Sequence, residues 1–199
     1  MTMAVTYLLE VQSSIGRRDT GILKLKTSAG EPPSALALLE RYAAIGNEKE
    51  LPDVLRDARD WCATVRQSHV AHPSLIYFRT TGTGSGWPAA LGALIDLALT
   101  VETLLDAPEL RGLAIMLRED GRGMAEELGS LVGLAPKPQA TPEESLRRIA
   151  ARLAAAGYRL RPMPDFDSFG RMRAGPAGWI AAMAEHLGRS TAPLAPGEG

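Results

Sequence analysis

Hydrophobic side chains recur at intervals of three and four residues along most of the chain, and polar side chains fill the positions between them. This spacing gathers the apolar residues on one face of a helix, whereas a half-buried strand needs alternation of apolar and polar residues. The pattern is clearest in residues 51–69, where arginines and aspartates lie opposite the apolar face. The sequence therefore predicts an all-α protein.

Residues 87–105 are apolar on nearly all sides of a helix, which is typical of a helix surrounded by others. The segment is long enough to cross a bilayer, but it carries Asp96 near its middle and Glu102 further on. A central carboxylate costs about 2.5–3.5 kcal/mol on insertion into a membrane. We therefore predict an irregular bundle of roughly six to seven helices around this buried central helix.

Glycine, proline and small polar residues divide the chain into four parts. Residues 1–18 resemble the end of a truncated membrane-type helix, because an apolar run is followed by two arginines, as at a cytoplasmic exit. The apolar run is about half of the ~20 residues needed to span a bilayer. Residues 19–33 predict a linker, residues 34–188 a helical domain and residues 189–199 a disordered tail.

The charge balance excludes several classes of function. With 22 basic and 23 acidic residues the formal net charge is −1, so no overall field favours nucleic acid as a partner. Cys62 is the single cysteine, which excludes an intrachain disulfide framework and a multi-cysteine zinc site. This usage fits a reducing compartment, with the cytoplasm as the default location.

Two histidines near the end of one predicted helix raise the question of catalysis or metal binding. His69 and His72 would face the same way on a continuing helix, and a metal would need a third ligand such as His186 or Asp165. No H-E-x-x-H frame accompanies them, so packing and capping roles are favoured. Cys62 and His69 lie about 10.5 Å apart on one helix, too far for direct proton transfer. We predict no cofactor, no metal and no enzymatic activity.

The run TTGTGSG at residues 80–86 has the composition of a phosphate loop without its chemistry. It lacks the lysine of a P-loop, and it does not match the G-x-G-x-x-G turn of a dinucleotide-binding fold. It also lacks the flanking spans of a potassium filter. We predict a flexible connection between two helices.

Arg79 stands next to the start of the central helix. We predict that it forms a buried ion pair with Asp96, since a carboxylate inside a helical bundle needs a partner. Recognition of a carboxylate or phosphate ligand by Arg79 is the alternative.

Cys62, His69, His72, Arg79 and Asp96 all lie within a larger sequence pattern. It consists of RDWCATVRQSHVAHPSLIYFR, a variable loop, and GWPAALGALIDLAL. The pattern resembles the cytosolic C-terminal region of bacterial ion-channel-like membrane proteins, labelled two-pore-domain potassium channel family proteins. The matching positions in this sequence are Trp61, Ser68, His69, Pro73, Tyr77, Phe78, Arg79, Trp87, Ala89, Ala90, Leu91 and Asp96.

The resemblance implies a non-catalytic cytosolic domain that assembles or regulates a potassium channel-like pore at the inner face of the cell membrane. Its partners would be the transmembrane pore region, encoded upstream or on a companion chain, and further copies in a homo-oligomer. A stand-alone helical sensor that binds a small ligand near Arg79 is the alternative. The candidate structural or ligand-contact residues are Trp61, His69, Tyr77, Phe78, Arg79, Trp87 and Asp96. We expect Trp61 to pack on Trp87, and His69 and Arg79 to bond to the start of the central helix and to Asp96.

Overall fold

The computed structural model describes residues 2–79 and 82–196. Within these residues the chain is helical and forms no strand, which confirms the all-α prediction. The α-helices are α1 (Thr2–Ala29), α2 (Ala35–Ala44), α3 (Leu51–Ala71), α4 (Gly86–Thr103), α5 (Pro108–Leu131), α6 (Glu143–Ala155) and α7 (Phe166–His186). Two short 3-10 helices are η1 (Glu48–Glu50) and η2 (Pro73–Tyr77).

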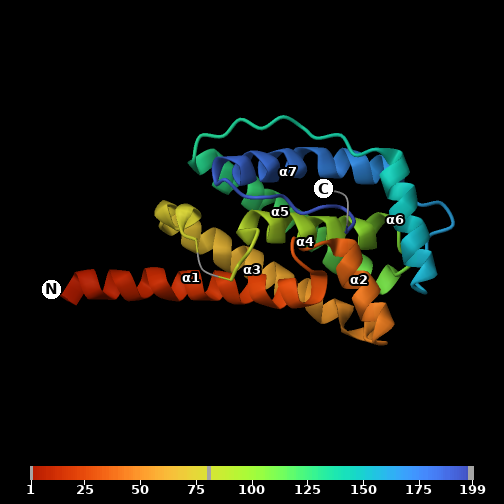
Figure 1. The fold of residues 1–199 in the computed structure, drawn as a ribbon, viewed down its shortest axis with the longest axis horizontal. Helices are drawn as coiled ribbons and strands as arrows, with labels where there is room; N and C mark the ends of the chain where they lie inside the picture. The colour runs from red at the N-terminus through yellow and green to blue at the C-terminus, as the bar shows by residue number, and fades with distance from the viewer. Residues whose placement is uncertain (1, 80–81, 197–199) are drawn as a thin grey trace.

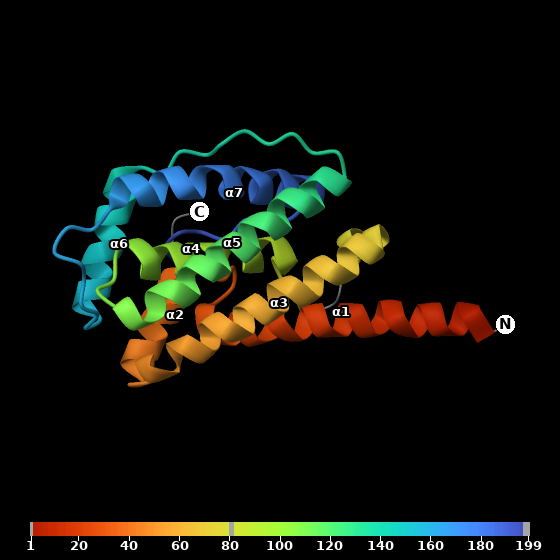
Figure 2. The ribbon, with the colours of Figure 1, turned by 180° about the vertical axis from the view of Figure 1, so that it is seen from behind.

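The central helix of the bundle is α4, as its sequence predicts. Every residue from Gly86 to Val101 is buried. Figures 1 and 2 show α7 along one side of α4, α1 and α3 along the opposite side, and α5 crossing between them on a third side. The helices α2 and α6 close one end of the bundle. Because neighbours cover α4 all round, apolar residues are needed on every face of it.

The first helix, α1, continues through most of the predicted linker, residues 19–33, and does not end at the predicted boundary after residue 18. It ends at Ala29, which is buried in the core together with Ile22. The hydroxyl groups of Thr20 and Thr27 each donate to the carbonyl oxygen four residues earlier. The polar residues that suggested a linker are therefore satisfied inside the helix, while its apolar face packs on the domain.

The C-terminal segment also differs from the prediction. Residues 189–196 were predicted to belong to a disordered tail, but they pack on the bundle. Ala192 is buried, and its Cβ lies 3.4 Å from where a Cβ on Gly92 of α4 would stand. The carbonyl oxygen of Leu194 accepts a hydrogen bond of 3.2 Å from Ser34 Oγ. Small side chains let this segment lie close against α4, so the domain extends beyond the predicted range 34–188 on both sides. Residues 197–199 lie outside the described residues.

Candidate functional site

The end of α3 and the short helix η2 that follows it form a corner, which holds a buried arginine from α1. Arg18 is 2% exposed, and its guanidinium donates to the carbonyl oxygens of Leu75 at 3.0 Å and Phe78 at 3.1 Å. Its Nη1 also lies 3.4 Å from Nε2 of His69. In return, Nε1 of Trp61 donates to the carbonyl oxygen of Arg18 at 2.9 Å. These bonds join α1 to α3 and η2, and we call this set of five residues the α1 joint.

The electrostatics of the α1 joint keep His69 uncharged. Burial, and then the positive charge of Arg18, lowers the pKa of His69 to about 4. Because an arginine has no acceptor, the His69 nitrogen that faces it must be the unprotonated one. Asp19 accepts from Arg18 Nε at 3.0 Å, while its second carboxylate oxygen is buried without a protein partner among the described residues. One carboxylate therefore balances the guanidinium charge at this joint.

The two tryptophans named as candidates do not form the predicted pair. Trp61 lies against α1, where a Cβ on Gly21 would overlap its indole ring. Trp87 is 2% exposed, and its ring meets the ring of His69 edge-on at 6.0 Å between centroids. Its Nε1 donates to the carbonyl oxygen of Ile76 at 3.4 Å. Both residues do stabilise the corner, but Trp61 secures α1 and Trp87 supports His69.

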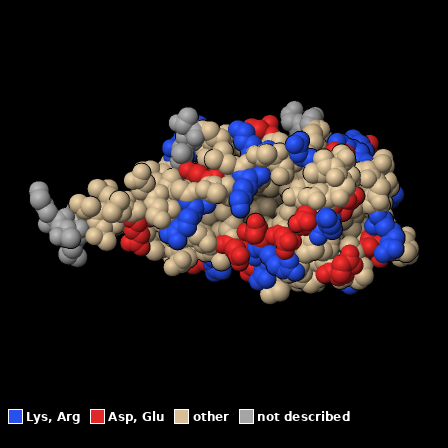
Figure 3. All heavy atoms as spheres, turned by 90° about the horizontal axis from the view of Figure 1, so that it is seen from below, with Lys and Arg blue, Asp and Glu red and all other residues tan. Residues whose placement is uncertain are grey.

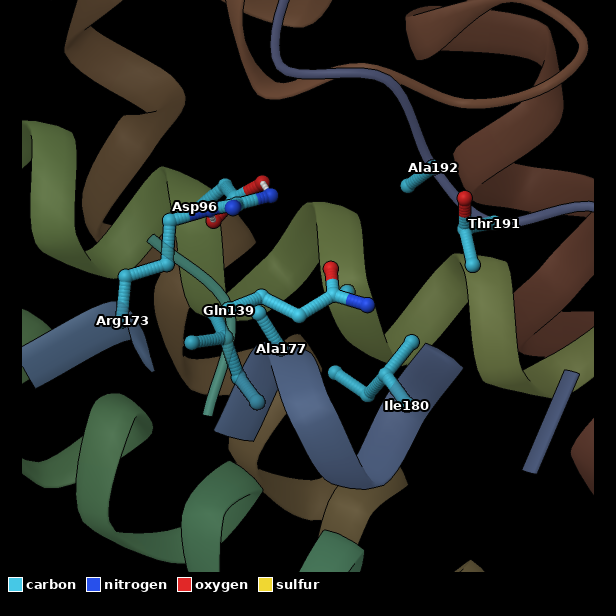
Figure 4. A pocket seen from close by; sticks show the side chains of 9 residues that line it. Asp96, Gln139, Arg173, Ala177, Ile180, Thr191 and Ala192 are labelled. Atoms are coloured by element: carbon cyan, nitrogen blue, oxygen red, sulfur yellow. Dashed lines mark hydrogen bonds and ion pairs between the residues drawn. The ribbon is translucent and has the colours of Figure 1, made fainter. Parts of the chain in front are cut away.

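The predicted ion pair between Arg79 and Asp96 is wrong, since Asp96 pairs with Arg173 of α7 (Figure 4). Arg173 donates from Nε to Oδ1 at 2.7 Å and from Nη2 to Oδ2 at 3.2 Å, and the two side chains are 14% and 5% exposed. Arg79 is exposed and lies near Arg189, whose pKa is lowered by burial and then by the charges of Arg79 and Arg18. Arg79 therefore lies at the surface, apart from the buried pair of Asp96 and Arg173.

The position of Arg173 in the sequence could have predicted that its side chain is buried. It stands on the same helical face as Phe169, four residues earlier, and Ile180, seven residues later, both of which are buried. An arginine at a core-facing position needs an internal partner. A cavity of about 40 Å³ adjoins the ion pair and is lined in part by Gln139 and Thr191 (Figure 4). That volume suits ordered water and is too small for a substrate.

The three histidines occupy separate surroundings. His72 meets the ring of Tyr7 at 5.3 Å between centroids, and His186 Nε2 lies 3.3 Å from the hydroxyl oxygen of Tyr77. His69, in contrast, is part of the α1 joint, where its Nε2 faces Arg18. In residues 2–79 and 82–196, no group of three or more His, Cys, Asp or Glu side chains could hold a metal ion.

The remaining candidates offer little for chemistry. Cys62 is buried, and burial followed by the nearby charge of Asp120 raises the pKa of its thiol to about 12. A protonated thiol is a poor nucleophile at neutral pH. The rings of Tyr77 and Phe78 are about half exposed, and the contribution of Phe78 to the α1 joint is its carbonyl oxygen.

The glycine-threonine run encloses a carboxylate of the protein itself. Glu31 Oε1 accepts from the backbone N–H of Ser85 at 2.8 Å, and a Cβ on Gly84 would overlap the same carboxylate. Gly84 has φ +54°, a conformation that glycine adopts easily. Lys26 pairs with Glu31 at 3.2 Å. Residues 82–86 are therefore tied to the end of α1 and are more than the flexible connection that we predicted, while residues 80–81 lie outside the described residues.

A groove of about 640 Å³ runs between α1 and α3. Its base is formed by buried side chains of the surrounding helices, among them Leu25, Leu38 and Leu94. Trp61 lines the wall on the α3 side. Figure 3 views the molecule from the side of α1 and shows basic and acidic side chains close together on this face. Sequence reasoning missed this groove because its walls come from segments that were predicted to be separate.

Packing between Gly21 and Trp61 should set the distance between α1 and α3. We expect Gly21→Ala to lower the free energy of unfolding by about 1–3 kcal/mol, because the added methyl group overlaps the indole. Gly16→Ala is the matched control on the same helix: no atom lies within 4 Å of its added Cβ, and it should raise stability by about 0.5–1 kcal/mol. Urea denaturation measures both variants, and equal effects would contradict the packing described.

Comparisons with protein-family models, curated proteins and solved structures found no match to this chain.

Proposed function

We propose that the chain is a non-catalytic helical domain that assembles or regulates a potassium-channel-like membrane protein, to which α1 attaches it. The observation that carries this proposal is an apolar stripe on the projecting end of α1. Val5, Leu8 and Leu9 follow one another at helical spacing and are 57%, 64% and 62% exposed. A stripe of this kind is typical of a surface that binds a membrane or an apolar partner.

The projecting end of α1 reaches beyond the rest of the bundle (Figures 1 and 2). No helix in the described parts of the chain is long and apolar enough to cross a bilayer by itself. Attachment by α1 would therefore be to the membrane interface or to apolar helices already inserted there.

The α1 joint supports a regulatory role for this helix. Arg18 is bonded to two carbonyl oxygens beyond the end of α3, so a displacement of α1 must break those bonds or move η2 with it. Trp87, on α4, packs against His69 of the same joint. A force on the projecting end of α1 would thus reach the central helix through packed and hydrogen-bonded groups.

Vesicle flotation tests the attachment. The purified chain should float with vesicles of phosphatidylethanolamine and phosphatidylglycerol, because the exposed stripe would bury its side chains there. The double variant Leu8→Glu, Leu9→Glu should stay at the bottom of the gradient. Leu23→Glu is the control, since Leu23 is also exposed on α1 but lies away from the projecting end. Equal flotation of all three proteins, or of none, would contradict the proposal.

The connection to a channel is tested separately by reading the DNA immediately upstream of Met1 in frame. Membrane spans and a pore loop in that frame would support the proposed partner. A stop codon and a ribosome-binding site directly before Met1 would count against it.

Small-molecule binding is a second candidate function, supported by the groove between α1 and α3. Its volume of about 640 Å³ falls within the range of about 300–1,000 Å³ that is usual for small-molecule sites. Arg79, the ligand-contact residue expected from sequence, lines neither this groove nor the small cavity beside Asp96.

A further inference from the structure

The groove between α1 and α3 has an apolar base and a charged mouth. Leu25, Leu38 and Leu94 at its base are each less than a tenth exposed, while Thr20 and Thr64 bring hydroxyl groups to its walls. A ligand that fits such a site needs an apolar body and a polar end.

The charges at the mouth are divided between its two walls. Arg17 and Lys24 stand on the α1 wall, seven residues and therefore about two turns apart, and Asp57 and Asp60 stand on the α3 wall. The ion pair between Lys24 and Asp57 crosses the mouth at 3.8 Å, with both side chains 72% exposed. A pair so exposed contributes little and can be exchanged for ligand contacts.

Arg17 and Asp60 are exposed and form no ion pair within residues 2–79 and 82–196. One free charge of each sign therefore remains on opposite walls of the same groove. A purely anionic ligand would meet two aspartates, and a purely cationic one would meet an arginine and a lysine. A ligand that carries both signs complements both walls.

We propose that this groove binds a zwitterionic amphiphile. Its apolar part lies against Trp61 and the leucine side chains at the base, its anionic group faces Arg17 and Lys24, and its ammonium group faces the α3 wall. The proposal rests on the second candidate function, small-molecule binding, and is independent of membrane attachment by α1. Two sources share this chemistry: a single-chain lipid with a zwitterionic head group, and a small peptide or amino acid with apolar side chains.

Tryptophan fluorescence measures the binding directly, because Trp61 lines the groove, while Trp87 is buried elsewhere and Trp179 lies against Gly129 of α5. Dodecylphosphocholine, kept below its micelle-forming concentration, and the dipeptide leucyl-leucine represent the two sources. Dodecanoate and dodecyltrimethylammonium carry one sign each. We expect a saturable change in emission with one of the zwitterions, at lower concentration than with either singly charged probe, and loss of that change in Trp61→Phe.

Charge reversal at the mouth gives the second readout. Arg17→Glu should weaken binding of the preferred zwitterion by about fivefold to tenfold, through the loss of a charge-assisted contact. Asp60→Lys should weaken binding by a similar factor, because it removes a negative charge from the α3 wall, which faces the ammonium group of the ligand. Both residues are exposed, so neither substitution disturbs the core. Arg111→Glu, an equal change of charge at an exposed position on α5, should leave the affinity as in the unaltered protein.

The possible results distinguish the assignment of a zwitterionic ligand from small-molecule binding in general. Saturable binding of the singly charged probes as tight as that of the zwitterions would overturn the zwitterion assignment and leave small-molecule binding standing. Binding of none of the four probes would overturn both. A zwitterion affinity that is indifferent to Arg17→Glu and to Asp60→Lys would place the bound molecule outside this groove.

Discussion

Replacing Arg173 with methionine is expected to lower the free energy of unfolding by about 3–5 kcal/mol, because it leaves the Asp96 carboxylate buried without a counter-charge. Methionine retains much of the volume of the arginine stem, so the loss reports mainly the missing charge and its hydrogen bonds. Asp96 is 5% exposed in its side chain and lies on α4, where the helix is covered on all sides. Urea denaturation at neutral pH measures the difference.

Arg79→Ala is the matched control, because Arg79 is the partner that the sequence predicts for Asp96. The exposed position of Arg79 makes a change within about 0.5 kcal/mol the expected result. The double variant Asp96→Leu, Arg173→Met should be more stable than Arg173→Met alone, since it removes both buried charges. A larger loss in Arg79→Ala than in Arg173→Met would restore the pairing predicted from sequence.

Acidification is expected to destabilise the protein through His69. The pKa of His69 is about 4 in the folded chain and about 6.5 in an unfolded one, so the unfolded state binds the proton first as the pH falls. The contribution of this group to stability is fully present above about pH 6.5, is lost as the pH falls from there towards about 4, and does not change further below that. Between about pH 7.5 and about pH 5 the expected loss is about 2 kcal/mol.

His69→Gln tests this titration, because glutamine offers an oxygen to Arg18 but does not bind a proton in this range. The loss of stability on acidification should shrink by about 2 kcal/mol in this variant. Arg18 and Asp19 are the charged groups of α1 that act on His69, and both stay in place. His186→Gln, at an exposed position on α7, should keep the full pH dependence. An unchanged pH dependence in His69→Gln would assign the acid sensitivity to other groups.

The sequence alone predicted a helical bundle around a buried α4, because the period of apolar residues is a local property of each helix. The ion-pair partners of the buried charges were harder to predict. Asp96 was recognised as a buried carboxylate, but any of the many arginines could have been its partner, and the nearest candidate in sequence was wrong. Arg18 was interpreted as part of a basic membrane exit. Its spacing from the buried residues Ile22 and Leu25 nevertheless places it on the core face of α1.

The local pattern of apolar and polar residues determined the class of fold and the central position of α4. Only the tertiary structure decided that α1 runs on to Ala29, that Arg18 enters the corner, and that Arg173 neutralises Asp96. It also created the groove, whose two walls lie about forty residues apart along the chain. The physical reason is that helix periodicity is set by neighbours in sequence, whereas the solvation of buried charges depends on groups brought together by folding.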